Sequence, residues 1–444
     1  MSLASTHTTS GALLLRGGSI LTSDGDLRIA DVLISDGRIA AIGDLSAEPG
    51  TQSIDATGRL VLPGLIDTHR HTWQSAVRGI GTGWDLNAYF GAMFFGIAPH
   101  YTADDVYVGT LLGALTALDA GITTMVDWSH IQNTPGHADA AIQALQDSGI
   151  RAVFAHGWPQ NGAATRAIDS TQPHPEDARR IREKSLGDDD ARVTMSLALR
   201  GPEFTSRETF ESDMQLAKDL DLRVTMHVGN GEYGPRYRAV ALLHELGLLG
   251  PHVTLVHTAT SSDEEFRMIA DSGARVSVSP HLETTMPGIG RPSTGRLLKA
   301  GIRPSLSVDT ETAVAGDMFT VMRATLATHR ADQNDPDPHP LEAADVFSFA
   351  TREGAAAAGL AGRAGVLDVG YAADVIVVRS DDVNLAPDPT LGTIVASAHA
   401  GNVDTVIVDG VIRKRDGRLS YPHLRDLLGN AAASRQRLLT YLPG

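Results

Sequence analysis

The segment LVLPGLIDTHRH, residues 60–71, joins an apolar run to a pair of histidines. Its first part, Leu60–Asp67, is typical of a strand that is buried on both faces in a parallel sheet. Polar side chains that follow such a strand lie at its carboxyl end, where α/β barrels place their active sites. His69 and His71 are two residues apart, so in an extended chain both imidazoles project to the same side. The segment therefore predicts a barrel strand that ends in chemically active histidines.

Seven further apolar runs follow, separated by stretches that include the helical patterns Ala103–Asp119 and Tyr237–Leu249. The seven runs are Ile122–Asp127, Ala152–His156, Val193–Leu197, Leu222–His227, Val253–His257, Arg275–Ser279 and Pro304–Asp309. Strands that alternate with helices are typical of parallel βα units. Eight such units favour an α/β fold of the (β/α)8 TIM-barrel type. An open doubly wound sheet stays an alternative, because the sequence does not reveal the order of the strands.

Both ends of the chain have a different sequence pattern, in which turn residues separate short apolar runs. Such runs occur between residues 12 and 54, and again at Ala373–Val378 and Thr405–Ile412. Neither end alone offers enough strands to close a core. We therefore expect one discontinuous β-sandwich domain from residues 1–59 and 365–444, and a barrel domain from residues 60–364.

The composition excludes several classes of protein. With 53 acidic against 37 basic residues, the formal charge of −16 opposes binding to nucleic acid or to an acidic membrane surface. No cysteine is present, which rules out disulfides and cysteine-ligated zinc. The longest apolar stretch, Ala88–Ala98, is too short to span a bilayer. The first ten residues are polar and lack the apolar core of a signal peptide, so we expect a cytoplasmic location.

Three of the later runs also end in residues that bind metals or protons, at His227, His257 and Asp309. A single His-x-His pair is a weak signal, because most histidines only make hydrogen bonds at a surface or in a core. Here the pair and the three later residues all lie at strand ends, so together they are a strong indication of a metal site. His69, His71, His227 and Asp309 form a set of three imidazoles and one carboxylate, which suits Zn²⁺ or Fe²⁺.

The sequence around these strand ends resembles that of the amidohydrolase superfamily. Within the superfamily, it resembles the branch of mononuclear aminohydrolases and chlorohydrolases that act on purines, pyrimidines and triazines. The motifs that carry the resemblance are Leu62–His71 with Gln74 and Arg78-Gly79, Ala120–Thr124, Met226-His227, Val256-His257, Ser279-Pro280, Ser307–Asp309 and Ala372–Val377. The resemblance covers nearly the whole chain. It implies a distorted (β/α)8 barrel with a small β-sandwich from both chain ends. It also implies metal held by His69, His71, His227 and Asp309, with His257 on the water or substrate and Asp309 taking the proton of the water.

One divalent metal is expected, Zn²⁺ in preference to Fe²⁺. Members of the superfamily with two metals bridge them by a lysine at the end of strand four, and here that strand, Val193–Arg200, contains none. The expected reaction is attack of metal-bound hydroxide on an sp² carbon, with hydrolytic deamination of an aminated N-heterocycle favoured. Alternatives on the same centre are dechlorination, hydrolysis of a cyclic amide or amidine, and a cyclising condensation. A non-catalytic scaffold is a further alternative, which the retained ligand set disfavours.

The chain departs from the family where deaminases carry His-x-x-Glu after strand five, with the glutamate as proton donor. Asn230 occupies that position, and a carboxamide cannot supply a proton. Candidate replacements are Glu283, Glu232 and His281. We favour Glu283 as a catalytic acid, because it follows strand seven in a loop expected over the metal.

The resemblance implies a planar heterocycle as the substrate. All four tryptophans lie between Trp73 and Trp158, where residues could line a pocket and stack on a planar ring. The expected substrate-binding residues are Gln74, Trp84, Trp128, Trp158, Asn230, Glu232 and His281. The neighbouring aromatic residues Tyr89, Phe90, Phe94 and Phe95 are expected in the core or in a subunit interface. The chain is expected to form a homodimer or a higher homo-oligomer.

Overall fold

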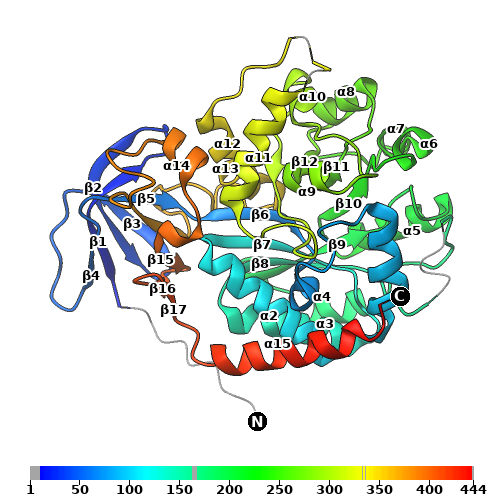
Figure 1. Cartoon of the computed structure of the whole chain (residues 1–444), viewed down its shortest axis with the longest axis horizontal. Helices are drawn as coiled ribbons and strands as arrows, with labels where there is room; N and C mark the ends of the chain where they lie inside the picture. The colour runs from blue at the N-terminus through cyan, green and yellow to red at the C-terminus, as the bar shows by residue number, and fades with distance from the viewer. Residues whose placement is uncertain (1–10, 163–167, 333, 336, 443–444) are drawn as a thin grey trace.

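Two β-sheets organise the chain in the computed structural model, which describes residues 11–162, 168–332, 334–335 and 337–442. A barrel-like sheet with surrounding helices occupies the right-hand part of Figure 1, and a second sheet lies beside it on the left. Residues from both ends of the chain build this second sheet. This arrangement confirms the fold class predicted from the sequence.

The barrel sheet has eight parallel strands that follow one another in chain order. Its strands are β6(Leu65–Arg70), β7(Ile122–Ser129), β8(Arg151–His156), β9(Val193–Leu199), β10(Val224–Val228), β11(Val253–His257), β12(Arg275–Val278) and β13(Ser305–Leu306). A doubly wound sheet would place later strands on both sides of the first one. Because the order is sequential, the open-sheet alternative is wrong.

The chain that follows β13 closes the barrel against β6. The Asp309 N–H donates a hydrogen bond to the His69 carbonyl at 2.9 Å, and the His71 N–H donates to the Asp309 carbonyl at 2.8 Å. Arg70 and Asp309 form an isolated parallel bridge. The first and last strand ends therefore meet at the point where the candidate ligands lie.

The predicted strand Leu60–Asp67 is in fact two strands in two different sheets. β5(Arg59–Pro63) pairs with strands of the terminal sheet, and β6 begins after Gly64. A Cβ atom at Gly64 would lie 2.0 Å from Thr123 Oγ1. The chain thus crosses between the sheets through a space that admits only glycine, which hydrophobic periodicity does not reveal.

The terminal sheet contains nine strands. They are β1(Leu13–Leu21), β2(Leu27–Ser35), β3(Arg38–Gly43), β4(Gln52–Asp55), β5, β14(Val375–Arg379), β15(Val403–Val408), β16(Val411–Arg415) and β17(Arg418–Leu419). The sheet folds back on itself, because the Ile39 N–H donates to the Tyr371 carbonyl at 2.9 Å, just before β14. The enclosed core includes Leu15, Ile34, Val61 and Val377. The boundary of the two predicted domains stays a prediction.

Helices cover the outside of the barrel. The α-helices before β11 are α1(Leu86–Tyr89), α2(Ala103–Asp119), α3(Pro135–Ser148), α4(Asp177–Lys184), α5(Arg207–Asp219), α6(Tyr233–Tyr237) and α7(Ala239–Glu245). Those after β11 are α8(Asp263–Ser272), α9(Pro280–Thr285), α10(Thr294–Lys299), α11(Met318–Ala331), α12(Ala343–Phe349), α13(Arg352–Ala357), α14(Leu391–Ser397) and α15(Leu424–Leu439). Short non-α turns are η1(Thr72–Val77), η2(Phe90–Ile97), η3(Ala98–His100) and η5(Ala400–Asn402). The predicted helix Ala103–Asp119 matches α2, whereas Tyr237–Leu249 shortens to α7.

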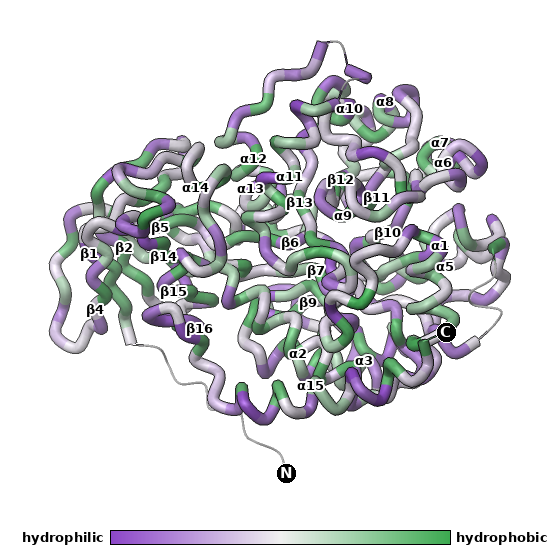
Figure 2. The backbone as a smooth tube through the Cα atoms, viewed as in Figure 1, coloured by the Kyte–Doolittle hydropathy of each residue, from purple (hydrophilic) through white to green (hydrophobic). Residues whose placement is uncertain are grey.

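The last helix, α15, packs on α2 of the barrel although it follows the terminal sheet in sequence. Its buried residues recur every three or four positions, at Leu427, Ala431, Ser434 and Leu438. Hydrophobic and hydrophilic residues accordingly alternate along it in Figure 2. The C-terminal segment thus fastens the terminal sheet to the barrel.

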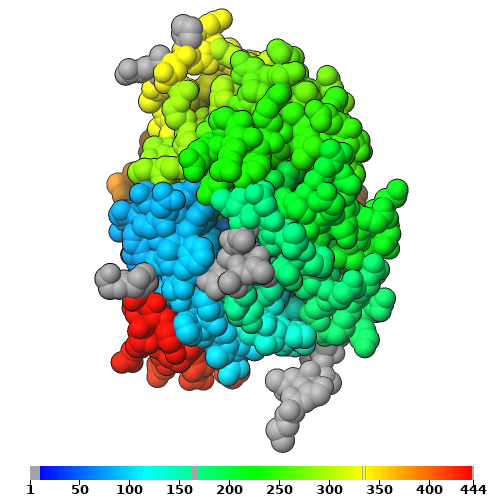
Figure 3. All heavy atoms as spheres, turned by 90° about the vertical axis from the view of Figure 1, so that its right-hand side faces the viewer, coloured from blue at the N-terminus to red at the C-terminus, as the bar shows by residue number. Residues whose placement is uncertain are grey.

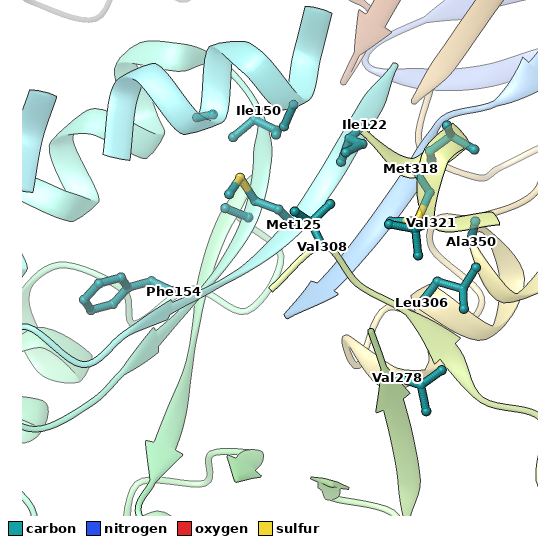
Figure 4. Packing of buried hydrophobic residues seen from close by; sticks show 14 of the residues in the cluster. Ile122, Met125, Ile150, Phe154, Val278, Leu306, Val308, Met318, Val321 and Ala350 are labelled. Atoms are coloured by element: carbon teal, nitrogen blue, oxygen red, sulfur yellow. The ribbon is translucent and has the colours of Figure 1, made fainter. Parts of the chain in front are cut away.

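The main core lies between the outward-facing side chains of the strands and the helices. Figure 4 shows Met125 and Phe154 from β7 and β8 on one side, and Leu306 with Met318 and Val321 on the other. Side chains that alternate with these point into the barrel, as Val126 does next to Met125. The strands are therefore buried on both faces, which explains their continuous apolar runs.

The apolar segment Ala88–Ala98 spans the end of α1, η2 and the start of η3. This segment lies on the face shown in Figure 3, in light blue. It is next to residues from the middle of the chain, which are coloured green. Within the described part of the chain, no helix has both the length and the apolarity that a membrane crossing requires.

Candidate metal centre and substrate cavity

Three histidines and one aspartate converge at the carboxyl ends of the barrel strands. His69 Nε2 lies 3.1 Å from His227 Nε2, and the ligand atoms of His69, His71 and His227 all lie within 4.8 Å of one another. Asp309 Oδ1 lies 3.6 Å from His69 Nε2 and 3.3 Å from His71 Nε2. The structure thus brings together the four residues that the sequence pattern selected.

Burial favours the neutral form of the three imidazoles. It lowers the pKa of His69, and it lowers the pKa values of His71 and His227 well below the usual value. His71 Nδ1 lies 3.2 Å from the Trp128 carbonyl oxygen, so Nδ1 carries the proton and the Nε2 lone pair faces the cluster. Neutral imidazoles are the form that binds divalent metals.

The spacing of the donors fits one tetrahedral ion. Two nitrogens at about 2.0–2.1 Å from Zn²⁺ are separated by about 3.3 Å at a tetrahedral angle. His69 and His227 already lie near this separation, and three imidazoles with one carboxylate are a common zinc or iron donor set. The residues present therefore fit a single divalent metal.

His257 lies between two carboxylates beside this cluster. Its Nε2 is 3.2 Å from Asp309 Oδ2, and its Nδ1 is 2.9 Å from Glu283 Oε1. Burial alone lowers the pKa of His257, but its hydrogen bonds to Asp309 and Glu283 outweigh burial and raise the pKa to about 9. A protonated imidazole is a poor metal ligand, so this geometry suits a role for His257 in holding a proton.

Asp309 is ionised despite its burial. Burial raises the pKa of this carboxyl, yet hydrogen bonds from His257 and His69 hold it well below its usual range. His257 and Asp309 also share a left-handed backbone, with φ of 72° and 71°. Such a conformation costs energy in residues with a Cβ atom, and it is concentrated at functional sites. Here it turns both side chains into the mouth of the barrel.

A cavity of about 380 Å³ opens above the cluster. Residues of the cluster that line it are His71, His227 and Asp309, and the neighbouring His257 lines it as well. Trp128 is fully buried and its ring centroid lies 4.1 Å from that of His227, and Trp158 packs edge-on against Trp128 at 5.3 Å. Two of the three predicted tryptophans thus line the cavity, and Trp158, which is partly exposed, can stack on a planar ring.

Gln74 and Trp84 do not line the cavity. Gln74 is buried, donates to Tyr89 Oη at 2.8 Å and accepts from Thr310 Oγ1 at 2.6 Å. Tyr89 and Thr310 do line the cavity, so Gln74 lies behind its wall in contact with two lining residues. Trp84 is half-buried and packs against the hydrophobic core near Gly81.

The candidates for the missing proton donor lie in different places. Asn230 lines the cavity, and its Oδ1 is buried without a hydrogen-bond partner among the described residues. Glu232 is exposed at the start of α6, and His281 is half-buried on α9, both outside the cavity lining. Glu283 is buried behind His257 and also accepts from the Ser279 N–H at 2.9 Å. Its direct contact is therefore with His257 and not with the cavity.

The sequence analysis did not predict several of the residues that line the cavity. Tyr89, Phe90, Phe94 and Phe95 line the cavity, which the sequence did not indicate. Tyr89 is also part of the main core, with Phe90 and Phe94 packed against it, as expected. Their side chains reach the site because α1 and η2 cover the barrel mouth, which is a tertiary arrangement. His130 also lines the cavity, and it could have been found from its place two residues after Trp128 at the end of β7.

Two further polar residues lie after β9. Arg200 lines the cavity, whereas Glu203 is buried behind it. Glu203 Oε1 accepts a hydrogen bond of 2.5 Å from the Gly229 N–H, next to Asn230. Burial raises the pKa of Glu203 to about 8. Both follow the apolar run of β9 within four residues, a strand-end position that the sequence analysis examined only for lysine.

A barrel with such a cluster at the carboxyl ends of its strands is typical of metal-dependent hydrolases. The chain matches the model of the amidohydrolase family over residues 60–413. A relative, 5'-deoxyadenosine deaminase of Methanothermobacter thermautotrophicus, is 30% identical over 92% of this chain and 94% of its own. The chain belongs to the amidohydrolase family and is a hydrolase that acts on C–N bonds.

Solved structures share the fold. An adenosine deaminase from Xanthomonas campestris with bound zinc has a TM-score of 0.85 at 22% identity, over 96% of this chain and 98% of its own. Triazine hydrolase from Arthrobacter aurescens has a TM-score of 0.85 at 23% identity, over 96% of this chain and 100% of its own. At these identities, the likeness supports the barrel and the terminal sheet.

Proposed function

We propose that this chain hydrolyses the bond between an exocyclic amino group and an sp² ring carbon of an N-heterocycle. The observation that carries the proposal is the cluster of His69, His71, His227 and Asp309 at the base of an aromatic cavity. The named activity of the relative, deamination of an adenosine derivative, points the same way. The product would be the ring carbonyl compound and ammonia.

His69, His71, His227 and Asp309 would hold one divalent metal. When bound, such an ion lowers the pKa of a coordinated water toward neutrality and polarises the substrate. The zinc in the structural relative favours zinc for this site, and iron stays a second possibility.

Asp309 and His257 would move the proton that the water loses. Asp309 is the ionised carboxylate nearest the imidazole cluster, and its Oδ2 already contacts His257 Nε2 at 3.2 Å. The proton passes from Asp309 and His257 to the amino nitrogen, the C–N bond breaks, and ammonia leaves. Glu283 holds His257 in place through Nδ1, so it acts as a positioning residue.

The ring of the substrate would lie against Trp128 and Trp158. Asn230 offers its carboxamide to the heterocycle, and its buried oxygen can accept a hydrogen bond from a ring N–H. Gln74 would hold Tyr89 and Thr310 at the wall. Trp84, Glu232 and His281 lie outside the cavity lining. This division makes the aromatic wall responsible for the planar heterocycle.

A second candidate function is displacement of a leaving group that needs no proton, such as chloride. Asn230 favours it, because the carboxamide cannot protonate a departing nitrogen. The likeness to triazine hydrolase is compatible with it at the level of the fold. Ring-amide hydrolysis and cyclising condensation have no specific observation in their favour.

A panel of substrates tests both candidates. The zinc-loaded protein is incubated with aminopurines, aminopyrimidines and aminotriazines, and with the matching chloro compounds, while ammonia and chloride are measured. Ammonia release from at least one aminated ring supports deamination. Chloride release with no ammonia from any aminated ring supports the second function and rejects the first.

The remaining expectations are part of this proposal. A homodimer or higher homo-oligomer, a cytoplasmic location and the division into residues 1–59 with 365–444 and 60–364 stay predictions. The acidic balance of the chain disfavours nucleic acid as a partner. A small planar molecule is the partner that the cavity favours.

A further inference from the structure

Among the described residues that line the cavity, Arg200 is the one arginine. Arg200 follows β9 directly, and the register of β9 with β10 pairs Leu199 with Met226, so Arg200 is the lateral neighbour of His227. Both residues line the cavity. The guanidinium is therefore held on the same rim of the barrel as the metal-ligating imidazoles.

The position of the guanidinium is fixed by its surroundings. Arg200 is 3% exposed, donates to Ser170 Oγ at 2.9 Å and donates a second hydrogen bond to the Gln172 carbonyl. Its Cζ lies 5.9 Å from the centroid of the Trp158 ring. A guanidinium that is buried and anchored in this way presents a preorganised positive charge.

Ring contacts connect this charge with the metal centre. They lead from His227 to Trp128 and from Trp128 to Trp158, and the Arg200 guanidinium lies 5.9 Å from the centroid of the Trp158 ring. A heterocycle stacked on Trp158, with Trp128 perpendicular to that ring, could direct one edge toward the metal cluster and a substituent toward Arg200. The wall thus distinguishes a reacting edge from a charged edge.

The charge of the wall selects the substituent. Among the described residues that line the cavity, Asp309 is the sole carboxylate, and the proposed metal would engage it. A ribose diol is commonly bound by a separate carboxylate, so the cavity offers little for a nucleoside sugar. A planar fork of N–H donors instead matches a carboxylate.

We propose that the substrate is an aminated heteroaromatic ring that carries a carboxylate, and that Arg200 binds this carboxylate. The inference rests on the proposed function for the reacting edge of the ring. It assigns a substrate class that differs from the nucleosides named for the relative. The alternative is that Arg200 only fastens the wall segment at Ser170 and Gln172.

Calorimetric binding to the zinc-loaded chain separates these roles without any turnover. The probes are 2-naphthoate and 2-naphthamide, which share ring and shape and differ in charge. The wild-type protein should bind 2-naphthoate at least about tenfold more tightly, since hydrogen bonds between charged groups are stronger than neutral ones. R200Q should bind both probes equally, and R200K should retain part of the preference, because lysine keeps the charge but loses the fork.

Arg236 provides a matched control. Its guanidinium lies 5.0 Å from the Tyr237 ring, but it is exposed and outside the cavity lining, so R236Q changes the net charge equally. R236Q should keep the wild-type preference. Equal binding of both probes by the wild type, or a preference that survives in R200Q, overturns the proposal, the latter because the metal would then bind the carboxylate. Retained binding of 2-naphthamide by R200Q shows that the cavity is intact.

The binding test and the ammonia test fail independently. Loss of the preference in R200Q with no ammonia from any substrate would reject the proposed deamination and retain the carboxylate site. Ammonia release from uncharged rings, with no preference for 2-naphthoate, would retain deamination and reject the role of Arg200.

Discussion

Replacement of Glu203 by glutamine should change how the stability of the protein depends on pH. Glu203 is fully buried, and its Oε1 accepts a hydrogen bond from the Gly229 N–H at 2.5 Å, while Oε2 has no hydrogen-bond partner among the described residues. Burial raises the pKa of the carboxyl to about 8. Glutamine keeps the accepting oxygen and removes the ionisation.

The size and the sign of the effect follow from the difference in proton binding. Below about pH 4.5 the carboxyl is protonated in both the folded and the unfolded chain, so its ionisation costs no stability. As the pH rises toward 8, the unfolded chain ionises first, and the wild type loses about 1.4 kcal/mol per pH unit. From pH 5 to pH 8 the wild type should therefore lose on the order of 3 kcal/mol relative to Glu203→Gln.

Urea unfolding of both proteins at pH 5, 6, 7 and 8 measures this difference. Other buried carboxyls titrate as well, but they are common to both proteins and cancel in the comparison. Glu208→Gln, on the exposed first turn of α5, serves as the control and should follow the wild type at every pH. A difference between the wild type and Glu203→Gln that does not change with pH would refute the reasoning.

Three further substitutions test the assignments at the metal cluster. Elemental analysis should find about one zinc or iron per wild-type chain and almost none in His71→Ala; two metals per wild-type chain, or none after reconstitution, would contradict the four-ligand site. His257→Ala should keep its metal and lose about 10²–10⁴-fold in turnover, and metal loss would show that His257 is a ligand. Glu283→Gln removes one of the two carboxylates that raise the pKa of His257, so the limb of the pH–rate profile that reports His257 should move to lower pH. An unmoved limb would show that Glu283 does not act through His257.

The sequence predicted those parts of the site that depend on single strands. His69 and His71 follow one apolar run, and His227 and Asp309 end two others. Parallel strands in sequential order bring such ends to one rim. His69, His71, His227 and Asp309 could therefore be selected without a structure. The motif resemblance strengthened the same choice.

The parts that the sequence did not predict depend on contacts between distant segments. Nothing local shows that Gly64 carries the chain from one sheet to the other past Thr123. Similarly, Tyr89 and Phe94 are aromatic residues of the kind found in a core. Only the position of α1 and η2 in the fold shows that they line the cavity. Glu283 was expected as an acid in a loop over the metal, but it lies in the helix α9, where it contacts His257 and does not line the cavity.

The central claim is that water, activated at this cluster, replaces an amino group on a ring. Its most direct test is one reaction in H₂¹⁸O with an aminated heterocycle that the panel identifies, in which ammonia and ¹⁸O in the product are both counted. We expect one ammonia and one ¹⁸O atom per turnover, and the loss of both in Asp309→Asn. Ammonia release without ¹⁸O in the product, or release that Asp309→Asn leaves unchanged, would contradict the account.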